Sequence, residues 1–320
     1  MKYTNLLQLC KFSSLRRASK RCLSINKNSA LNPQSGFNNG FQQRYLWNHS
    51  TRNMSHDSNS RGQSVNEQYT HFGYEQVKEE EKVDKVYGVF ENVADSYDLM
   101  NDFMSAGTHR LWKNHFVNSL QLKPGMKILD MAGGTGDIAF KMLDNLAHTS
   151  KSNTESGTEI IVSDINKNML DVGKRRATKL GIQEKFQWVQ ANAEDLPFED
   201  ESIDLYTIAF GIRNTTHIDK VLDEAYRVLK FGGRFACLEF SHVENPVLKT
   251  LYDSYSFQVI PVLGQVIAQD WNSYQYLVES IRQFPSQEHF SDMIYNAGFT
   301  NVMYENLTFG VVAIHDGFKI

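Results

Sequence analysis

The sequence predicts an α/β fold, in which a mostly parallel β-sheet carries helices on both faces. Two observations support this prediction. From residue 126 onward, short apolar runs alternate with stretches of helical periodicity, which is the pattern of a parallel sheet. A glycine-rich turn at 130–137 joins the first apolar run to the first helical stretch. We expect strands at 126–131, 159–164, 186–191, 203–210 and 233–240, and helices at 138–147, 167–180 and 217–229.

Further elements are expected on either side of this alternation. Apolar residues recur at helical spacing from Val83 to Val93, so an amphipathic helix should precede the first strand. Serine and asparagine dominate residues 151–158, which predicts a surface loop. Near the C-terminus we expect a helix at about 287–296, followed by a final hairpin of two extended runs, 299–307 and 310–319.

The glycine turn predicts a ligand site. Gly134, Gly136 and Ala139 have the spacing of a dinucleotide fingerprint, so a nicotinamide or flavin cofactor is one interpretation. Charge favours another interpretation, because Asp130 and Asp137 flank the turn and would repel a pyrophosphate. The same carboxylates would attract a ligand that carries an ammonium and a sulfonium group. S-adenosylmethionine is such a ligand.

Polar residues follow the next three predicted strands. Asp164 closes the second strand, where a carboxylate could bind the ribose of the ligand. Asn192 and Ala193 follow the third strand and could contact an adenine edge, although a polar turn without a ligand is the alternative. Arg213 and Asn214 follow the fourth strand, where they would face the transferable methyl group. As an alternative, Arg213 could only pair with a carboxylate of a lid or helix.

The N-terminal residues differ in composition from the rest. Residues 1–56 carry nine basic and no acidic residues, with scattered leucines and phenylalanines, which is typical of a mitochondrial transit peptide. A disordered basic arm that binds nucleic acid is the alternative. Residues 57–74 are polar and are expected to form a linker, so the folded domain should occupy residues 75–320.

Charge and cysteine content exclude several classes of protein. Without the leader, the chain has 24 basic and 37 acidic residues, which disfavours a nucleic-acid substrate. Cys10 and Cys22 lie in the leader and only Cys237 remains, so we expect no disulfide framework and no cysteine-based metal site. No apolar run approaches the roughly 18 residues that a membrane-spanning helix needs.

An apolar and aromatic segment at about 245–285 interrupts the alternation. Insertions beyond the carboxyl ends of strands in such sheets form lids over ligands. An apolar lid would suit an apolar substrate. The alternative is another pair of helices that pack in the core, and periodicity does not separate the two.

Two long segments resemble the signatures of the ubiquinone/menaquinone biosynthesis C-methyltransferase family. They are residues 97–113, YDLMNDFMSAGTHRLWK, and residues 227–241, RVLKFGGRFACLEFS. With the glycine turn and the two polar loops, the resemblance runs from about Glu75 to the C-terminus. The sequence departs from the family pattern at Phe231, where proline is usual, and at Ala209, where some bacterial relatives have serine. Neither position is a presumed reacting group.

The resemblance implies a Rossmann-like class I S-adenosylmethionine-dependent methyltransferase. Its sheet should have seven mostly parallel strands with an antiparallel C-terminal strand, a helical N-terminal extension and the apolar lid insertion. The reacting quinol should lie near Tyr97, Arg213 and Asn214, and the role of Tyr97 rests on the resemblance alone. The cofactor-binding residues are expected to be Asp130, Gly134, Thr135, Gly136, Asp164, Asn192 and Ala193.

The implied reaction is the C-methylation of 2-methoxy-6-polyprenyl-1,4-benzoquinol in ubiquinone biosynthesis. The basic leader favours the mitochondrial branch of the family, at the matrix face of the inner membrane. Peripheral membrane contact and membership of a multi-subunit biosynthetic complex are expected, and a homodimer is left open. The alternatives are a demethylmenaquinol methyltransferase, a nicotinamide oxidoreductase and a non-enzymatic scaffold subunit of a quinone-biosynthesis complex.

Overall fold

The computed structural model describes residues 69–93, 107–149, 157–259 and 271–320, together with residues 101, 102, 105, 261, 262 and 265. These described residues all belong to one compact unit. The predicted transit peptide, most of the predicted linker, Tyr97 and nearly all of the predicted surface loop lie outside them.

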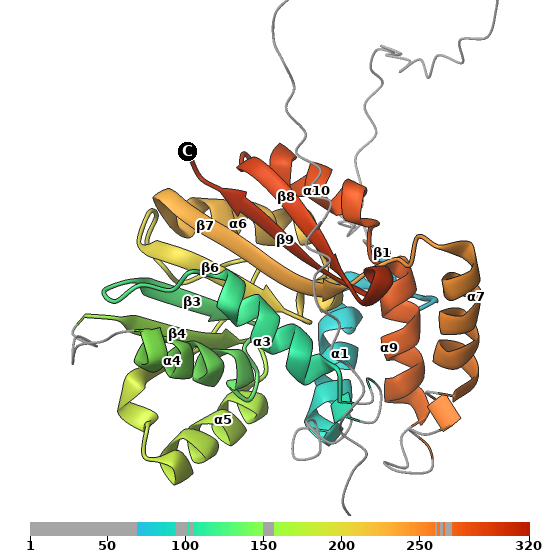
Figure 1. Ribbon diagram of the computed structural model, residues 1–320. Coiled ribbons are helices and arrows are strands. Elements are labelled where there is room, and N and C mark those ends of the chain that lie inside the picture. Colours follow the sequence, from blue (N-terminus) through green and yellow to red (C-terminus); the bar gives the residue numbers. More distant parts are fainter. Residues whose placement is uncertain are drawn as a thin grey trace, which may run out of the picture. The chain divides into compact units, whose positions relative to one another are not determined.

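A seven-stranded sheet forms the centre of the fold, in the order β5-β4-β3-β6-β7-β9-β8 (Figure 1). Neighbouring strands from β5 to β7 are parallel, whereas β9 is antiparallel to both β7 and β8. This arrangement confirms the predicted fold class. The strands are β3 (Lys127–Met131), β4 (Glu159–Asp164), β5 (Phe186–Gln190), β6 (Ile203–Ala209), β7 (Leu229–Phe240), β8 (Thr300–Leu307) and β9 (Val312–Phe318).

Helices cover both faces of this sheet, and each face has its own apolar core (Figure 1). One core contains buried residues of α6 and α10, and the other contains buried residues of α3, α4 and α5. The central strands are therefore buried on both sides, which explains their continuous apolar runs. The helices are α3 (His109–Ser119), α4 (Asp137–Thr149), α5 (Lys167–Leu180), α6 (Ile218–Val228) and α10 (Gln287–Asn296), with single 3₁₀ turns at η1 (Gln183–Lys185), η2 (Ile212–Asn214) and η4 (Thr308–Gly310).

Local signals in the sequence set the ends of two of these helices. The side chain of Asn166 caps α5 by accepting a hydrogen bond from the Met169 amide, and Gly181 ends it in the left-handed conformation. Ser286 caps α10 in the same way, through the His289 amide. Both helices have the predicted bounds for this reason.

Strand β7 is longer than the sequence predicts. The expected strand began at residue 233, but the observed strand begins at Leu229. Leu229 pairs with Ile203, and the register shifts before Leu205 pairs with Arg234. Gly232 and Gly233 lie in this irregular segment, and a pair of adjacent glycines is typical of a turn. The sequence pattern therefore predicted the strand only from the end of this irregular segment.

An N-terminal hairpin and helix precede the sheet. The hairpin consists of β1 (Tyr69–Phe72) and β2 (Glu75–Lys78), and it leads into α1 (Glu79–Val93). The helix was expected, whereas the first strand lies in residues predicted to be a linker. That strand was not recognised because its four residues alternate only between exposed and half-buried positions.

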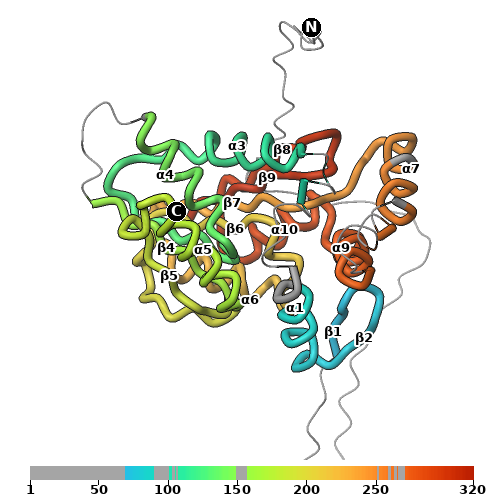
Figure 2. Tube along the Cα trace, turned by 90° about the horizontal axis from the view of Figure 1, so that it is seen from below, coloured from blue at the N-terminus to red at the C-terminus, as the bar shows by residue number. Residues whose placement is uncertain are grey.

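The apolar segment contains α7 (Pro246–Ser254), a π-helical turn η3 (Tyr255–Val259) and α9 (Trp271–Gln283). Helix α9 lies beside the N-terminal hairpin (Figure 2). The Phe72 and Tyr276 rings stack with centroids 4.2 Å apart, and the Tyr74 amide donates to Glu279 over 2.9 Å. The N-terminal hairpin and α9, which lie about two hundred residues apart in the sequence, are therefore in contact.

Candidate active site

The carboxyl ends of β3, β4 and β6 and the loop after β5 open into one cavity. It encloses about 1130 Å³, including the space at its open mouth. Helices α1 and α3 supply further walls. Six of the seven predicted cofactor residues line it: Asp130, Gly134, Thr135, Asp164, Asn192 and Ala193.

The glycine turn allows the backbone to pass under this cavity. Gly134 and Gly136 have φ angles of 53° and 83°, which favour glycine. Gly136 is not part of the lining. A β-carbon there would lie 2.9 Å from the Trp188 ring and 3.1 Å from the Phe140 ring, so this glycine permits close packing behind the turn.

Asp130 presents an unsatisfied carboxylate oxygen in the lining. Its Oδ1 accepts a hydrogen bond of 2.9 Å from the Thr207 hydroxyl, whereas its buried Oδ2 has no partner among the described residues. Burial raises the pKa of Asp130 to about 7, and the neighbouring Asp137 and Asp164 contribute to this shift. As an acidic residue of the lining, Asp130 could offset the charge of the ammonium group of S-adenosylmethionine.

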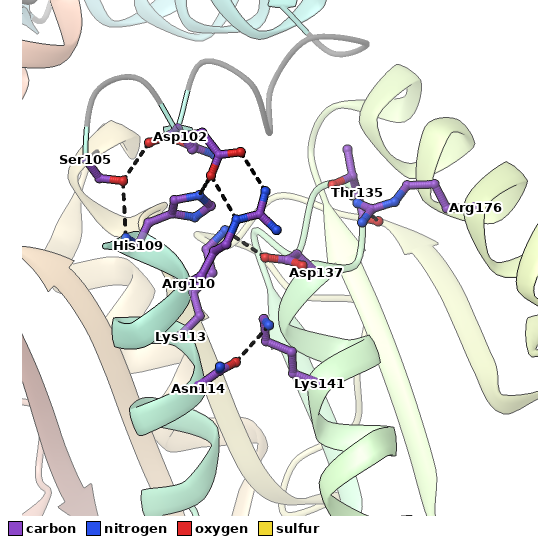
Figure 3. Close-up of polar contacts among 11 residues, drawn as sticks. Asp102, Ser105, His109, Arg110, Lys113, Asn114, Thr135, Asp137, Lys141 and Arg176 are labelled. Carbon is purple, nitrogen blue, oxygen red and sulfur yellow. Dashed lines mark hydrogen bonds and ion pairs between the residues drawn. The ribbon is translucent and has the colours of Figure 1, made fainter. Parts of the chain in front are cut away.

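Asp164 lies on the other side of the glycine turn. Its two oxygens accept hydrogen bonds from the Gly134 amide over 3.0 Å and from the Asn166 amide over 2.8 Å. Burial raises its pKa to about 6, despite these hydrogen bonds. The hydroxyl of Thr135 accepts a 2.8 Å hydrogen bond from Arg176, which fixes the second half of the turn (Figure 3).

The loop after β5 is folded back on itself. The side chain of Asn192 accepts a hydrogen bond of 3.1 Å from the Glu194 amide, and the backbone of Asn192 bridges to Asp195. Ala193 is 5% exposed and lines the cavity. The structure thus brings Asn192 and Ala193 into one lining with Asp164, and their contacts with adenine and ribose stay a prediction.

The two predicted catalytic residues of η2 have different surroundings. Asn214 lines the cavity, and its Oδ1 accepts a 3.0 Å hydrogen bond from the Tyr276 hydroxyl. Arg213 is not in the lining. Its guanidinium is buried and lies 2.8 Å from Glu239, and it also lies over the Phe240 ring. The carboxylate that pairs with Arg213 therefore belongs to β7 and not to a lid or helix.

The wall formed by α1 is held by a polar cluster. Glu194 accepts the Thr216 amide over 2.7 Å, and its other oxygen lies 2.8 Å from His217 Nδ1. The second ring nitrogen of His217 lies 3.0 Å from Glu79 on α1. Lys82, also on α1, donates to the carbonyl of Thr215, and its burial lowers its pKa. Helix α1 is thereby fixed to the loop that follows Asn214.

These features can be compared with known proteins. A model of the ubiE/COQ5 methyltransferase family matches residues 75–319. The chain belongs to the ubiE/COQ5 methyltransferase family. This methyltransferase is 54% identical over 277 residues to the mitochondrial 2-methoxy-6-polyprenyl-1,4-benzoquinol methylase of Xenopus laevis, covering 78% of this chain and 89% of that protein. It is 55% identical over 276 residues to the Homo sapiens protein of the same name, covering 78% and 84% of the two chains.

A solved structure with the same fold is the S-adenosylmethionine-dependent methyltransferase of Thermotoga maritima. It matches with a TM-score of 0.50 and 19% identity, covering 73% of this methyltransferase and all of that chain. Membership of the family confirms the predicted methyl donor, S-adenosylmethionine, and the predicted methyltransferase activity. The nicotinamide interpretation of the glycine turn was therefore wrong, and the charge argument was correct.

Sequence reasoning missed three polar residues of this site. Lys113 lines the cavity from α3, Tyr276 contacts Asn214 from α9, and Glu239 holds Arg213. Lys113 and Glu239 lie inside the two family signatures, which is the signal that could have identified them. Among the described residues, no cluster of His, Cys, Asp or Glu could hold a metal ion, and no helix is both long and apolar enough to cross a bilayer.

Proposed function

We propose that this methyltransferase C-methylates 2-methoxy-6-polyprenyl-1,4-benzoquinol in ubiquinone biosynthesis. The observation that carries the proposal is the 54–55% identity to methylases of that name, over 78% of this chain. Three of the predicted cofactor residues, Asp130, Asp164 and Asn192, line the cavity, which supports an active enzyme.

The chain acts in the mitochondrion in this proposal, at the matrix face of the inner membrane and within a biosynthetic complex. The relatives are named mitochondrial, and the basic, acid-free residues 1–56 support cleavage of a transit peptide. Mitochondrial import followed by N-terminal sequencing would test this part. Retention of residues 1–56 in the mature protein would contradict it.

The apolar segment supports contact with a polyprenyl tail or with the membrane that contains it. Several large apolar side chains on and around α7 and α9 are exposed. Their exposed fractions are 69% for Val247, 41% for Phe257, 48% for Val262 and 41% for Trp271.

The acceptor ring carbon must be made nucleophilic, and in this proposal the residues of η2 do this. The donor supplies an electrophilic methyl group when bound. The ring carbon gains electron density when a ring hydroxyl loses its proton, so a positive group near the oxygen favours attack. We assign this role to Arg213, which adjoins Asn214 in η2 and would act through its charge, since its guanidinium is buried outside the cavity lining. Glu239 fixes the guanidinium.

Asn214 and Tyr97 position the hydroxyl, or a water molecule that accepts its proton. The Tyr276 hydroxyl donates to Asn214 and thereby fixes the orientation of its amide. The role of Tyr97, which lies outside the described residues, rests on the family resemblance. After methyl attack, loss of the proton at the methylated carbon restores the aromatic ring.

A substrate panel tests the proposal. The purified chain is incubated with S-adenosylmethionine and either a short-tailed 2-methoxy-6-polyprenyl-1,4-benzoquinol or demethylmenaquinol, and the methylated products are identified by mass spectrometry and NMR. We expect methylation of the benzoquinol at a ring carbon. A preference for demethylmenaquinol would contradict the assigned substrate. Donor binding without methylation of either quinol would favour the scaffold alternative.

A further inference from the structure

The lining of the cavity has an uneven charge. Among the described residues, it contains Asp130, Asp137, Asp164 and Glu194, but a single cation, Lys113. The Lys113 side chain comes from α3, is 6% exposed and lies 2.8 Å from Asp137 Oδ2 (Figure 3). The ion pair with Lys113 outweighs the burial of Asp137, and the pKa of this carboxyl falls below its usual value. Lys113 is therefore a fixed positive charge at the glycine turn.

S-adenosylmethionine needs such a charge. Its amino-acid end carries an ammonium and a carboxylate, and the unpartnered oxygen of Asp130 suits only the ammonium. The carboxylate of the ligand would be repelled by the surrounding acidic side chains unless a cation offsets them. An ammonium has three donors, so Lys113 can hold Asp137 and still donate to a ligand.

The position of Lys113 matches the amino-acid end of the ligand and not its nucleoside end. Asp164, with Asn192 and Ala193, is assigned to the ribose and adenine. Asp130 and Asp137 are the acidic residues on either side of the glycine turn, and Lys113 pairs with Asp137 at the first residue of α4. The positive end of the helix dipole at the start of α4 also favours a carboxylate.

Helix α3 is well fixed for this purpose. The Trp112 indole donates to Thr308 over 2.8 Å, and Phe116 is fully buried against the sheet. Lys141 of α4 donates a 2.8 Å hydrogen bond to Asn114 of α3 (Figure 3), and Asn145 of α4 donates one of 2.9 Å to Asn118 of α3. These contacts fix the helix that carries Lys113 beside the glycine turn.

We propose that Lys113 binds the carboxylate of the methionine part of S-adenosylmethionine. Lys113 thereby favours a methyl donor that has this carboxylate over one that lacks it. This inference rests on the methyl donor and is independent of which quinol accepts the methyl group.

The test compares S-adenosylmethionine with decarboxylated S-adenosylmethionine, which lacks only this carboxylate. Calorimetry gives the Kd of each for the wild-type chain and for Lys113→Met. We expect the wild type to bind the decarboxylated compound about ten- to a hundredfold more weakly, as for one hydrogen bond between charged groups. In Lys113→Met the two compounds should bind within about threefold of each other.

Two further variants separate the carboxylate contact from structural effects. Lys141→Met removes a lysine from the neighbouring helix, at a position outside the cavity lining, and should keep the wild-type discrimination. The double variant Lys113→Met with Asp137→Asn removes both members of the ion pair, so no unpaired carboxylate is left beside the ligand. It should also lose the discrimination.

The outcomes are distinct. Equal binding of the two compounds by the wild type would overturn the proposal, and this measurement needs no variant to fold. Unchanged discrimination in Lys113→Met would also overturn it, because Lys113 would then only connect α3 to α4. Binding of neither compound by the wild type would instead contradict S-adenosylmethionine as the methyl donor, and with it the proposed function.

Discussion

The affinity of this methyltransferase for S-adenosylmethionine should depend on pH through two buried carboxyls. Burial raises the pKa of Asp130 to about 7 and that of Asp164 to about 6. A cationic ligand binds when both are ionised, so the apparent Kd is the intrinsic Kd divided by the ionised fraction. At pH 6 about one Asp130 in eleven and half of Asp164 are ionised, whereas at pH 7.5 most of both are. The affinity should therefore fall about fifteenfold from pH 7.5 to pH 6.

The assay is a calorimetric titration with S-adenosylmethionine at half-unit steps between these pH values. The ammonium of the ligand keeps its proton throughout most of this range, since α-amino groups titrate near pH 8. In Asp130→Asn the amide can still accept the Thr207 hydroxyl, but the charge is gone. This variant should bind more weakly at pH 7.5, and its remaining pH dependence should be only about twofold, from Asp164.

The same pKa shifts give an independent control on the free protein. The pKa of Asp130 is about 7 in the folded state, whereas an unperturbed aspartate carboxyl has a pKa of 3.8. Between these values the folded state binds more protons than the unfolded state, so stability should decline as pH rises toward 7. Asp130→Asn should weaken this decline. An affinity that is flat from pH 6 to 7.5, or a pH dependence unchanged in Asp130→Asn, would refute the reasoning.

Three further predictions concern the acceptor side of the site and the packing behind it. Arg213→Ala should lower kcat with little change in the Kd of S-adenosylmethionine, which turnover assays and calorimetry measure, and loss of donor binding would contradict the assignment. In urea unfolding the same variant should lose about 3–5 kcal/mol of unfolding free energy, because Glu239 is left buried without its partner. Tyr276→Phe keeps the stacking on Phe72 but loses the hydrogen bond to Asn214, so the free energy of unfolding should fall by about 1 kcal/mol and kcat should fall without a change in donor affinity. An unchanged kcat would show that Asn214 does not depend on this hydrogen bond. Gly173→Ala would place a methyl group against the Trp188 ring and should cost about 1–3 kcal/mol in urea unfolding, whereas Gly88→Ala on α1, with no atom within 4 Å of the new methyl group, should be neutral or stabilising.

The sheet could be predicted from the sequence because its strands are buried on both sides. Mostly apolar runs such as 203–210 then have few other interpretations, and helix ends such as Asn166 and Gly181 carry local signals. Strand β1 had no such signal. It is only four residues long, and its place in the structure depends on contacts such as the stacking of Phe72 on Tyr276, about two hundred residues away.

The residues of the candidate site also fall into those that the sequence predicted and those that it did not. The cofactor residues follow consecutive strands of a parallel sheet, so the rule that carboxyl ends meet at one edge was enough to group Asp130, Asp164 and Asn192. Lys113 and Tyr276 come from helices outside the alternation. Their position depends on how α3 and α9 pack, which the sequence pattern did not specify. The surroundings of Arg213 were also undetermined, because its partner Glu239 lies on a different strand.

This division follows from how the two halves of the site are built. The predicted cofactor half is held by the sheet and its turns, because Asp164 at the end of β4 accepts a hydrogen bond from the Gly134 amide in the turn after β3. The other half is closed by helices that reach the loops through polar side chains, as in the contacts of Glu79 with His217 and of Tyr276 with Asn214. Side-chain contacts at a cavity are weaker than a buried sheet and can open separately from it. Helices α1 and α9 therefore depend on side-chain contacts for their position, whereas the predicted donor residues depend on the sheet.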